Sequence, residues 1–186
     1  PTPDGEVLTR RALAARSDWQ APLVIKPINE GSSVGVDIIL EGDNIPPLET
    51  GDPEATVLVE RYIPGREVQV AVAFDILSPG RFYDYEAKYA PGGSRHVMPA
   101  PIPEDDYRAA CEMSLQAHRL LGCRGITRSD LRYDDTGEGP PKLFLLEVNT
   151  QPGMTATSLA PEIALHRGID FETLCTRLVE DASCDR

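Results

Sequence analysis

Apolar residues recur along the chain either at every second position or in short unbroken runs, and both patterns are typical of β-strands. Val68, Val70 and Val72 alternate with more polar or smaller residues, whereas residues 57–59 form an unbroken Val-Leu-Val run. These patterns predict a half-buried strand from Glu67 and a buried strand shortly before it. Further strands are expected at residues 23–25, 34–40, 82–89, 125–133 and 143–149.

A helical period of apolar residues appears in other parts of the sequence. Between Leu8 and Trp19 the apolar positions are spaced i, i+4, i+7 and i+11, as on one face of a helix. A second helix is expected to begin near Glu104, because the helix macrodipole favours acidic residues in the first turn. Two more helices are expected, near residues 161–167 and from Phe171. The inward positions are expected to be Tyr107, Ala110, Cys111, Leu115 and Leu121 in the second helix, and Phe171, Leu174, Cys175, Leu178 and Val179 in the last.

The predicted strands and helices follow one another in mixed order, which indicates an α+β fold. Residues 41–56 are rich in Gly, Pro and acidic side chains and are expected to form a surface connection. Apolar residues make up 41% and charged residues 26% of the 186, a composition typical of a globular protein.

The chain is acidic, with 30 Asp and Glu against 18 Lys and Arg and a formal net charge of −12. Binding along a nucleic acid needs an extended basic face, so we expect no nucleic-acid partner. No apolar run approaches the roughly 20 residues of a membrane-spanning helix, so we expect no membrane partner. The cysteines show no CxxC pair and are expected to be reduced thiols in a cytoplasmic protein: Cys111, Cys123, Cys175 and Cys184.

The first candidate for chemistry is Lys26, which ends a predicted strand ahead of a loop of small residues at 30–35. A lysine and the backbone N–H groups of such a loop can bind phosphates. The spacing is not that of a P-loop, and from these residues alone an ordinary hairpin loop is the alternative.

The second candidate is a set of polar side chains on two predicted strands. Arg128 and Asp130 are two residues apart, as are Glu147 and Asn149, so each pair shares one face of its strand. If the strands are neighbours, the side-chain oxygens of Asp130, Glu147 and Asn149 can meet, and such a set suits Mg²⁺. The alternative is a pair of solvated polar faces on two edge strands.

Two loops are further candidates. A Pro-Gly-Met loop leads to Ser158 at the start of a predicted helix, where backbone N–H groups bind carboxylates well. The alternative for Ser158 is an ordinary helix cap, and one residue can fill both roles. Lys88 and Tyr89 precede a glycine-rich loop at residues 91–93, which could close over a substrate. An amphipathic strand whose lysine reaches solvent is the alternative there. The histidines are too isolated to indicate a metal site, and His118 is expected to be structural.

Taken together, the chain resembles the D-alanine–D-alanine ligases of the ATP-grasp superfamily. The matching stretches, in the family's order, are VIKPINEGSSVGV, VLVERYIPGREVQVAV, FYDYEAKY, CRGITRSD and LEVNTQPGMTATSLAP. The resemblance implies an ATP-grasp fold, in which two α+β subdomains sandwich the nucleotide. Residues 1–62 would be part of the central subdomain, with the phosphate-loop hairpin and the hinge. Residues 63–186 would be the C-terminal subdomain, with the metal, oxyanion and second-substrate sites.

The same resemblance implies roles for individual residues. The residues that match ATP contacts are Lys26, Ser32, Ser33 and Lys88 for the phosphates, Glu60, Arg61, Tyr62, Ile63 and Phe82 for the adenine, and Glu67 for the ribose. The residues that match the metal ligands, for two Mg²⁺ ions or alternatively Mn²⁺, are Asp130, Glu147 and Asn149. The residues that match the catalytic and D-alanine sites are Arg128 and Gly153 for the oxyanion, Ser32, Lys88 and Tyr89 near the reacting groups, and Ser158 and Leu159 for the second D-alanine's carboxylate.

The implied activity is the ATP-dependent joining of two D-alanines through an acyl phosphate, for peptidoglycan precursor synthesis in a bacterial cytoplasm. The implied partners are D-alanine, ATP and, at full length, a second copy in a homodimer. Arg61 stands where the family commonly has lysine, and the family's N-terminal domain is absent from the chain, which we therefore expect to be inactive alone. The alternatives are another ATP-grasp acid–amine ligase, such as a D-alanine–D-lactate ligase, or a nucleotide-binding or interaction module without catalysis.

Overall fold

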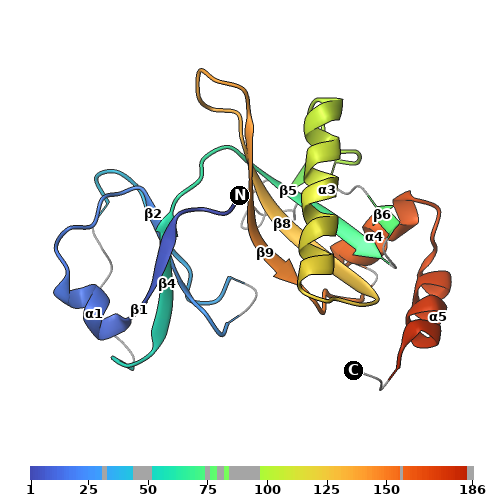
Figure 1. Cartoon of the computed structure of the whole chain (residues 1–186), viewed down its shortest axis with the longest axis horizontal. Coiled ribbons are helices and arrows are strands. Elements are labelled where there is room, and N and C mark those ends of the chain that lie inside the picture. The colour runs from blue at the N-terminus through green and yellow to red at the C-terminus, as the bar shows by residue number, and fades with distance from the viewer. Residues whose placement is uncertain are drawn as a thin grey trace. The chain divides into compact units, whose positions relative to one another are not determined.

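The computed structural model describes residues 1–30, 33–43, 52–73, 76–78, 82–83, 97–155 and 157–183. The chain divides into two compact units, Thr2–Ile63 and Pro64–Arg186, the second of which includes Pro1. That these units correspond to the central and C-terminal subdomains of the resemblance stays a prediction. The elements of Figure 1 are β1 (Gly5–Thr9), α1 (Arg10–Ala15), β2 (Leu23–Pro27), β3 (Asp37–Ile39), β4 (Thr56–Arg61), β5 (Arg66–Ala73), β6 (Ile76–Ser78), β7 (Phe82–Tyr83), α3 (Glu104–Leu120), β8 (Ile126–Asp134), β9 (Lys142–Asn149), α4 (Leu159–His166) and α5 (Phe171–Asp181).

The Thr2–Ile63 unit is built on an antiparallel sheet with the strand order β1-β4-β2-β3. Side chains alternate between the two faces of a strand, so Leu23 and Ile25 of β2 share a face with Val57 and Val59 of β4. These residues pack with Leu13 of α1 into the core of the unit. The buried strands predicted at residues 23–25 and 57–59 therefore form the centre of this sheet.

Residues 5–9 form a strand, whereas the sequence predicted that a helix over residues 8–19 would begin here. Strand β1 pairs with β4, from Gly5 opposite Glu60 to Thr9 opposite Thr56. The helix α1 begins only at Arg10, and Thr9 caps it by accepting a hydrogen bond from the Ala12 N–H at 3.1 Å. The prediction was wrong because helical spacing does not reveal that a neighbouring strand can satisfy the same backbone groups.

The Pro64–Arg186 unit contains a second antiparallel sheet, with the order β6-β5-β8-β9 and with β7 also paired to β5. Helix α3 lies across one face of this sheet (Figure 1). Val68 and Val70 of β5 and Leu131 and Tyr133 of β8 are buried there with Ala110 of α3. Strand β6 was not expected from the sequence.

Helices α4 and α5 cover one end of the opposite face. Ala73 of β5 and Ile126 of β8 are buried there with Ala160, Ala164 and Leu174 from the two helices. The sheet is therefore packed on one face by α3 and at one end of the other face by α4 and α5, and this second face carries the polar side chains described below.

The buried side of α3 differs in part from the predicted one. Leu121 was expected to point inward but is 62% exposed at the end of the helix. Ser114 and His118 occupy inner positions instead. Their polar atoms have partners, because the Ser114 hydroxyl donates to the Ala110 carbonyl at 2.9 Å and His118 Nδ1 lies 2.8 Å from Thr127 Oγ1. A search for apolar spacing misses such positions, since these side chains become suited to the core only through their hydrogen bonds.

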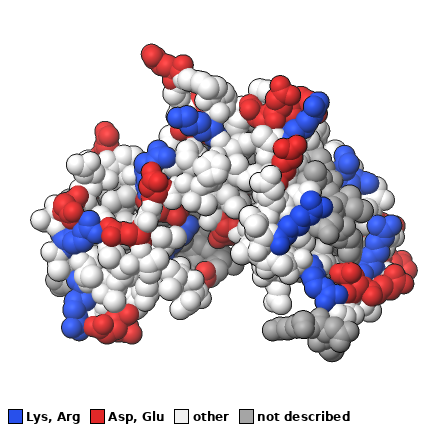
Figure 2. Space-filling view, viewed as in Figure 1, with Lys and Arg blue, Asp and Glu red and all other residues white. Residues whose placement is uncertain are grey.

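The described surface carries exposed apolar side chains, including the consecutive Leu120 and Leu121, as well as charged ones. Helix α5 buries Leu174 but exposes Phe171 and Val179, so the predicted apolar stripe is only partly an inner face. Acidic and basic side chains are interspersed on the face seen in Figure 2. Within the described part of the chain, no helix combines the length and the apolar character needed to cross a membrane.

Candidate functional site

Strands β8 and β9 place four of the predicted site residues in two facing pairs. Arg128 lies opposite Asn149, and Asp130 lies opposite Glu147. Directly opposite residues of antiparallel strands project from the same face, so the four side chains form one group. The alternative of two edge strands is wrong for β8, which lies between β5 and β9, and Asp130 is 7% exposed.

An irregularity in β9 separates this polar group from the apolar core on the same strand. Asp130 is opposite Glu147, but the next residue, Leu131, is opposite Leu145, so Leu146 is an extra residue in the ladder. A β-bulge of this kind changes which residues face each side of the sheet. Leu145 therefore packs against the α3 core, on the face of the sheet opposite to Glu147 and Asn149.

Arg128 is held by Asp130 through two hydrogen bonds, Nε to Oδ1 at 2.7 Å and Nη2 to Oδ2 at 2.9 Å. The two side chains are only 18% and 10% exposed. Burial by itself would lower the pKa of the Arg128 guanidinium, but the hydrogen bonds and charge of Asp130, with the charges of Glu147 and Glu67, leave that pKa raised. Arg128 is therefore a fixed cation among three carboxylates.

Strand β5 extends this group to a third strand. Gln69 lies opposite Asp130, and Glu67 lies opposite Arg132. Gln69 is 2% exposed, and its Nε2 donates to Glu67 Oε1 at 3.1 Å. Sequence reasoning gave Gln69 no role, although its place two residues after Glu67 on an alternating strand is a signal that the two share a face. We call this surface the polar face; its members are Glu67, Gln69, Arg128, Asp130, Glu147 and Asn149.

The oxygen atoms of the polar face suit a hard divalent cation. Asp130 and Glu147 supply carboxylates and Asn149 supplies an amide oxygen, which are ligands that Mg²⁺ accepts. The Asn149 Oδ1 accepts a hydrogen bond from the Gln151 N–H at 3.0 Å and keeps a second lone pair. The described residues contain no group of three His, Cys, Asp or Glu that could hold a metal ion. A metal on the polar face would therefore need the amide and non-protein ligands beside the two carboxylates, as Mg²⁺ commonly does.

The loop between β9 and α4 brings Gly153 against Ser158. A Cβ atom at Gly153 would lie 2.8 Å from Ser158 Oγ, closer than such atoms approach without a shift. Ser158 Oγ accepts a hydrogen bond from the Thr155 N–H at 3.0 Å and lies 2.8 Å from Thr155 Oγ1. Ser158 stands at the N-cap of α4 but makes no capping hydrogen bond with its side chain, so the interpretation as an ordinary cap is wrong.

On the Thr2–Ile63 unit, Lys26 and Glu60 form an ion pair with Nζ and Oε1 2.7 Å apart. Their side chains are 22% and 9% exposed. Lys26 is opposite Leu58 and Glu60 is opposite Val24, so both side chains lie on the face of the sheet away from the core. The structure thus brings together two residues for which the resemblance implied phosphate and adenine contacts.

The other predicted nucleotide-binding residues on this unit differ in how far they are buried. Ser33 is exposed in a turn with φ of 59°. After Glu60, Arg61 is exposed, Tyr62 is half-buried and Ile63 is buried. Several predicted site positions lie outside the described part of the chain, namely Ser32, Lys88, Tyr89 and the side chain of Phe82.

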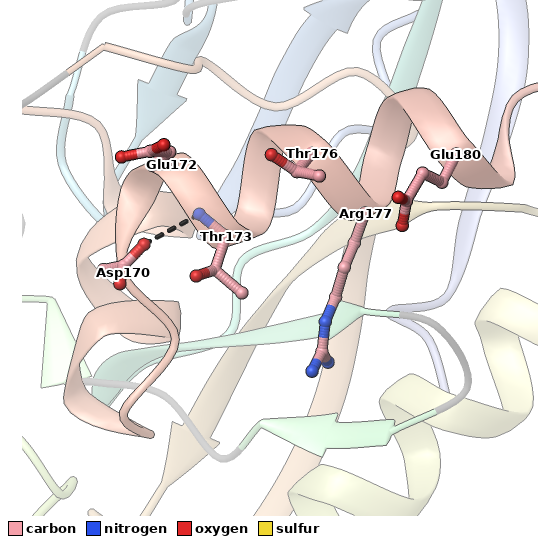
Figure 3. A pocket seen from close by; sticks show the side chains of 6 residues that line it. All are labelled: Asp170, Glu172, Thr173, Thr176, Arg177 and Glu180. Atoms are coloured by element: carbon pink, nitrogen blue, oxygen red, sulfur yellow. Dashed lines mark hydrogen bonds between the residues drawn. The ribbon is translucent and has the colours of Figure 1, made fainter.

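A hollow on α5 shares no residue with the polar face. Figure 3 shows its lining, which consists of Asp170, Glu172, Thr173, Thr176, Arg177 and Glu180. Asp170 caps the helix there by accepting a hydrogen bond from the Thr173 N–H at 2.7 Å, and that hydrogen bond is the largest cause of the lowered pKa of Asp170. Helix capping therefore accounts for the Asp170 hydrogen bond and for the lowered pKa of that carboxyl group.

The sequence matches the family model described as D-ala D-ala ligase C-terminus over residues 8–180. The chain belongs to this family. A D-alanine–D-alanine ligase of Paramagnetospirillum magneticum is 54% identical over 100% of this chain and 63% of its own length. A D-alanine–D-alanine ligase of Ruegeria pomeroyi is 50% identical over 100% of this chain and 62% of its own length. The chain thus spans less than two thirds of the length of these ligases.

Solved structures of ligases from this family share the fold of the chain. The D-alanine–D-alanine ligase of Bacillus anthracis complexed with ATP superposes with a TM-score of 0.70 at 27% identity, over 97% of this chain and 60% of that chain. The VanG D-Ala:D-Ser ligase of Enterococcus faecalis gives a TM-score of 0.72 at 27% identity, over 96% and 56% of the two chains. The predicted α+β fold of the ATP-grasp type is confirmed, and the match leaves the remaining part of those ligases uncovered.

Proposed function

We propose that this chain is the part of an ATP-dependent D-alanine–D-alanine ligase that binds nucleotide, metal and the second D-alanine. The observation that carries this proposal is the polar face, where Arg128 is fixed by Asp130 beside two further oxygen donors, Glu147 and Asn149. Membership of the ligase family supports it, because the relatives near 50% identity carry that name.

The proposed reaction has two steps. A carboxylate oxygen of the first D-alanine attacks the γ-phosphorus of ATP, the bond from that phosphorus to the β–γ bridging oxygen breaks, and ADP leaves. The amine of the second D-alanine then attacks the acyl carbon, loses a proton, and displaces inorganic phosphate to form the peptide bond. During this second step negative charge develops on the carbonyl oxygen, and the molecule must stabilise it.

We assign that stabilisation to Arg128 and the Gly153 N–H. Because two hydrogen bonds to Asp130 already fix the guanidinium, little reorganisation is needed when the charge appears. Asp130, Glu147 and Asn149 would hold Mg²⁺, which when bound offsets the charge of the phosphates. Ser158 and Leu159 are proposed to bind the carboxylate of the second D-alanine.

The proposed nucleotide contacts include residues of the Thr2–Ile63 unit. Lys26 would bind phosphate, and its present pairing with Glu60 at 2.7 Å keeps the ammonium in place before a phosphate arrives. The remaining nucleotide contacts of the proposal are those named for the resemblance, from Ser32, Ser33, Arg61, Tyr62, Ile63, Glu67, Phe82 and Lys88. Tyr89 is proposed to lie near the reacting groups. A bacterial cytoplasm and a homodimer at full length belong to the same proposal; reduced thiols, as at the free Cys111, Cys123 and Cys175, are compatible with that compartment.

The test is phosphate release from Mg-ATP by the protein expressed with the coding sequence upstream of Pro1, with D-alanine, L-alanine or D-lactate as substrate. Release that depends on D-alanine is expected. Release that requires D-lactate as the second substrate would move the assignment to a D-alanine–D-lactate ligase. Absence of release with every acid–amine pair, despite ATP binding, would refute a ligase function.

A matched pair of variants tests whether the polar face carries the activity. Glu147→Gln removes a proposed metal ligand, whereas Glu138→Gln removes an exposed carboxylate in the connection between β8 and β9. We expect Glu147→Gln to lower the rate of phosphate release, or to raise the Mg²⁺ concentration needed for half-maximal rate, by at least about tenfold. Even mutation of a residue that only hydrogen-bonds to a metal ligand typically has an effect of that size. Glu138→Gln is expected to behave as the unmodified protein, and equal effects of the two variants would contradict the assignment.

A further inference from the structure

Gln69 is a buried amide on a strand whose other inner positions are apolar. It lies on the polar face, directly opposite Asp130 of β8 and two residues after Glu67 on β5. Only 2% of the residue is exposed. A buried amide is expensive unless its donor and acceptor atoms are both paired, so its presence calls for a reason.

The orientation of the Gln69 amide follows from its neighbour. Glu67 Oε1 lies 3.1 Å from Gln69 Nε2, and an ionised carboxylate only accepts hydrogen bonds, so the NH₂ group faces Glu67. The Gln69 Oε1 atom is then left buried with no hydrogen-bond partner in the described structure. Asp130 cannot supply the missing donor, because its carboxylate also accepts and already receives two hydrogen bonds from Arg128.

Gln69 differs from Ser129, another buried residue of this sheet, in the face from which it projects. Among the described residues, the Oγ of Ser129 is also buried with no hydrogen-bond partner. Ser129 pairs with Val70 in the sheet, so it projects from the face that α3 covers. Gln69 projects from the polar face instead.

We propose that Gln69 is a positioning residue of the ligase site, which holds the Glu67 carboxylate through its N–H and receives an O–H hydrogen bond from the bound nucleotide complex through its Oε1. The inference rests on the proposed function. The O–H donor is either a ribose hydroxyl or a water molecule carried by the metal, since both present the chemistry that Oε1 lacks. Gln69 contacts no reacting atom in this assignment and acts by fixing Glu67 and the nucleotide.

The test compares Gln69→Met with Ser129→Ala in the protein expressed with the coding sequence upstream of Pro1. Methionine keeps the length of the side chain and removes both hydrogen bonds, whereas Ser129→Ala removes a buried unpaired hydroxyl from the opposite face of the same sheet. Binding of Mg-ATP is measured by calorimetry, the KM for ATP and kcat by phosphate release, and the melting temperature by circular dichroism. We expect Gln69→Met to raise the Kd and KM for ATP about tenfold or more, the range for hydrogen bonds to a charged group, with kcat little changed. Ser129→Ala is expected to change none of these.

Two further arms identify the O–H donor. If a ribose hydroxyl is the donor, Gln69→Met and the unmodified protein should differ less in nucleotide Kd when the nucleotide is the 2′-deoxy or 3′-deoxy form that lacks that hydroxyl. If metal-bound water is the donor, the difference in Kd should persist with both deoxy nucleotides and become smaller when Mg²⁺ is omitted. Either result supports the proposal.

A role for Gln69 in folding alone would give a lowered melting temperature with an unchanged Kd and KM for ATP, and that result would overturn the proposal. Should Gln69→Met fail to fold, Gln69→Glu, which is polar and of the same length, makes the same test: it removes the donor and adds negative charge beside Glu67, so ATP binding should weaken further. If the unmodified protein binds ATP but releases no phosphate with D-alanine, the proposed function fails, while calorimetry still decides whether Gln69 positions the nucleotide.

Discussion

Replacing Arg128 by methionine would leave the Asp130 carboxylate buried without its cation. Removing one partner of a buried ion pair costs about 3–5 kcal/mol, because the other charge is then left uncompensated. The Arg128 and Asp130 side chains are 18% and 10% exposed, so solvent relieves a small part of that penalty. We therefore expect Arg128→Met to lower the free energy of unfolding of the Pro64–Arg186 unit by about 2–4 kcal/mol.

Arg108→Met is the matched control for this prediction. Arg108 lies in the same unit and pairs with Glu104 one helical turn away at 3.2 Å, but the two side chains are 66% and 70% exposed. Exposed pairs of this kind contribute about 0.3–0.5 kcal/mol, since water already solvates both charges. The same chemical change should thus have an effect several times smaller at Arg108.

Urea denaturation followed by far-UV circular dichroism measures both variants against the unmodified chain. Trp19, the single tryptophan of the sequence, lies in the Thr2–Ile63 unit, so its fluorescence identifies the part of the transition that belongs to that unit. A loss for Arg128→Met no greater than that for Arg108→Met would refute the reasoning, because it would mean that the Arg128–Asp130 pair is solvated like a surface pair.

Three further predictions concern a thiol and two glycines. Burial raises the pKa of the Cys111 thiol to about 11. Since the thiolate is the nucleophile, Cys111 should resist a thiol-specific reagent at neutral pH and react faster as the pH rises towards that value. Cys111→Ala should lower the number of thiols labelled in urea by one and leave the labelling of the native protein unchanged. Gly65 has φ of +88° and a Cβ there would lie 2.2 Å from a carbonyl oxygen of β8, so Gly65→Ala should destabilise by more than about 2 kcal/mol in urea, whereas Gly137→Ala, in open space, should stay within about 0.5 kcal/mol. Gly153→Ala should lower the melting temperature through its contact with Ser158 Oγ, and adding Ser158→Ala should recover part of that loss; strictly additive effects would contradict the contact.

The second unit was easier to predict from the sequence than the first. Strands expected at 125–133 and 143–149 are found at Ile126–Asp134 and Lys142–Asn149, because their alternation and flanking glycines are strong local signals. The helix expected over residues 8–19 failed, because the backbone of residues 5–9 is hydrogen-bonded to β4, whose paired residues are 47 to 55 positions away in the sequence. Leu121 failed as a core position because α3 ends at Leu120, and apolar spacing alone does not show where a helix ends.

Most of the candidate site was predictable because it consists of residues two apart on strands. The sharing of a face by Arg128 and Asp130, and by Glu147 and Asn149, is a local property of an extended chain and follows from the sequence. Gln69 was missed because a single glutamine among valines matches no motif. Its significance appears only in the structure, where it donates to Glu67 on the same strand and lies opposite Asp130 on the next.

The amino-acid sequence by itself determined the family, the period of each strand and the types of side chain available for chemistry. Only the tertiary structure decided that β8 lies between β5 and β9, that Asp130 stands opposite both Gln69 and Glu147, and that a bulge at Leu146 separates the polar face from the core. The physical reason is that alternation depends on neighbouring residues, whereas strand order and register depend on which distant surfaces bury their apolar side chains together.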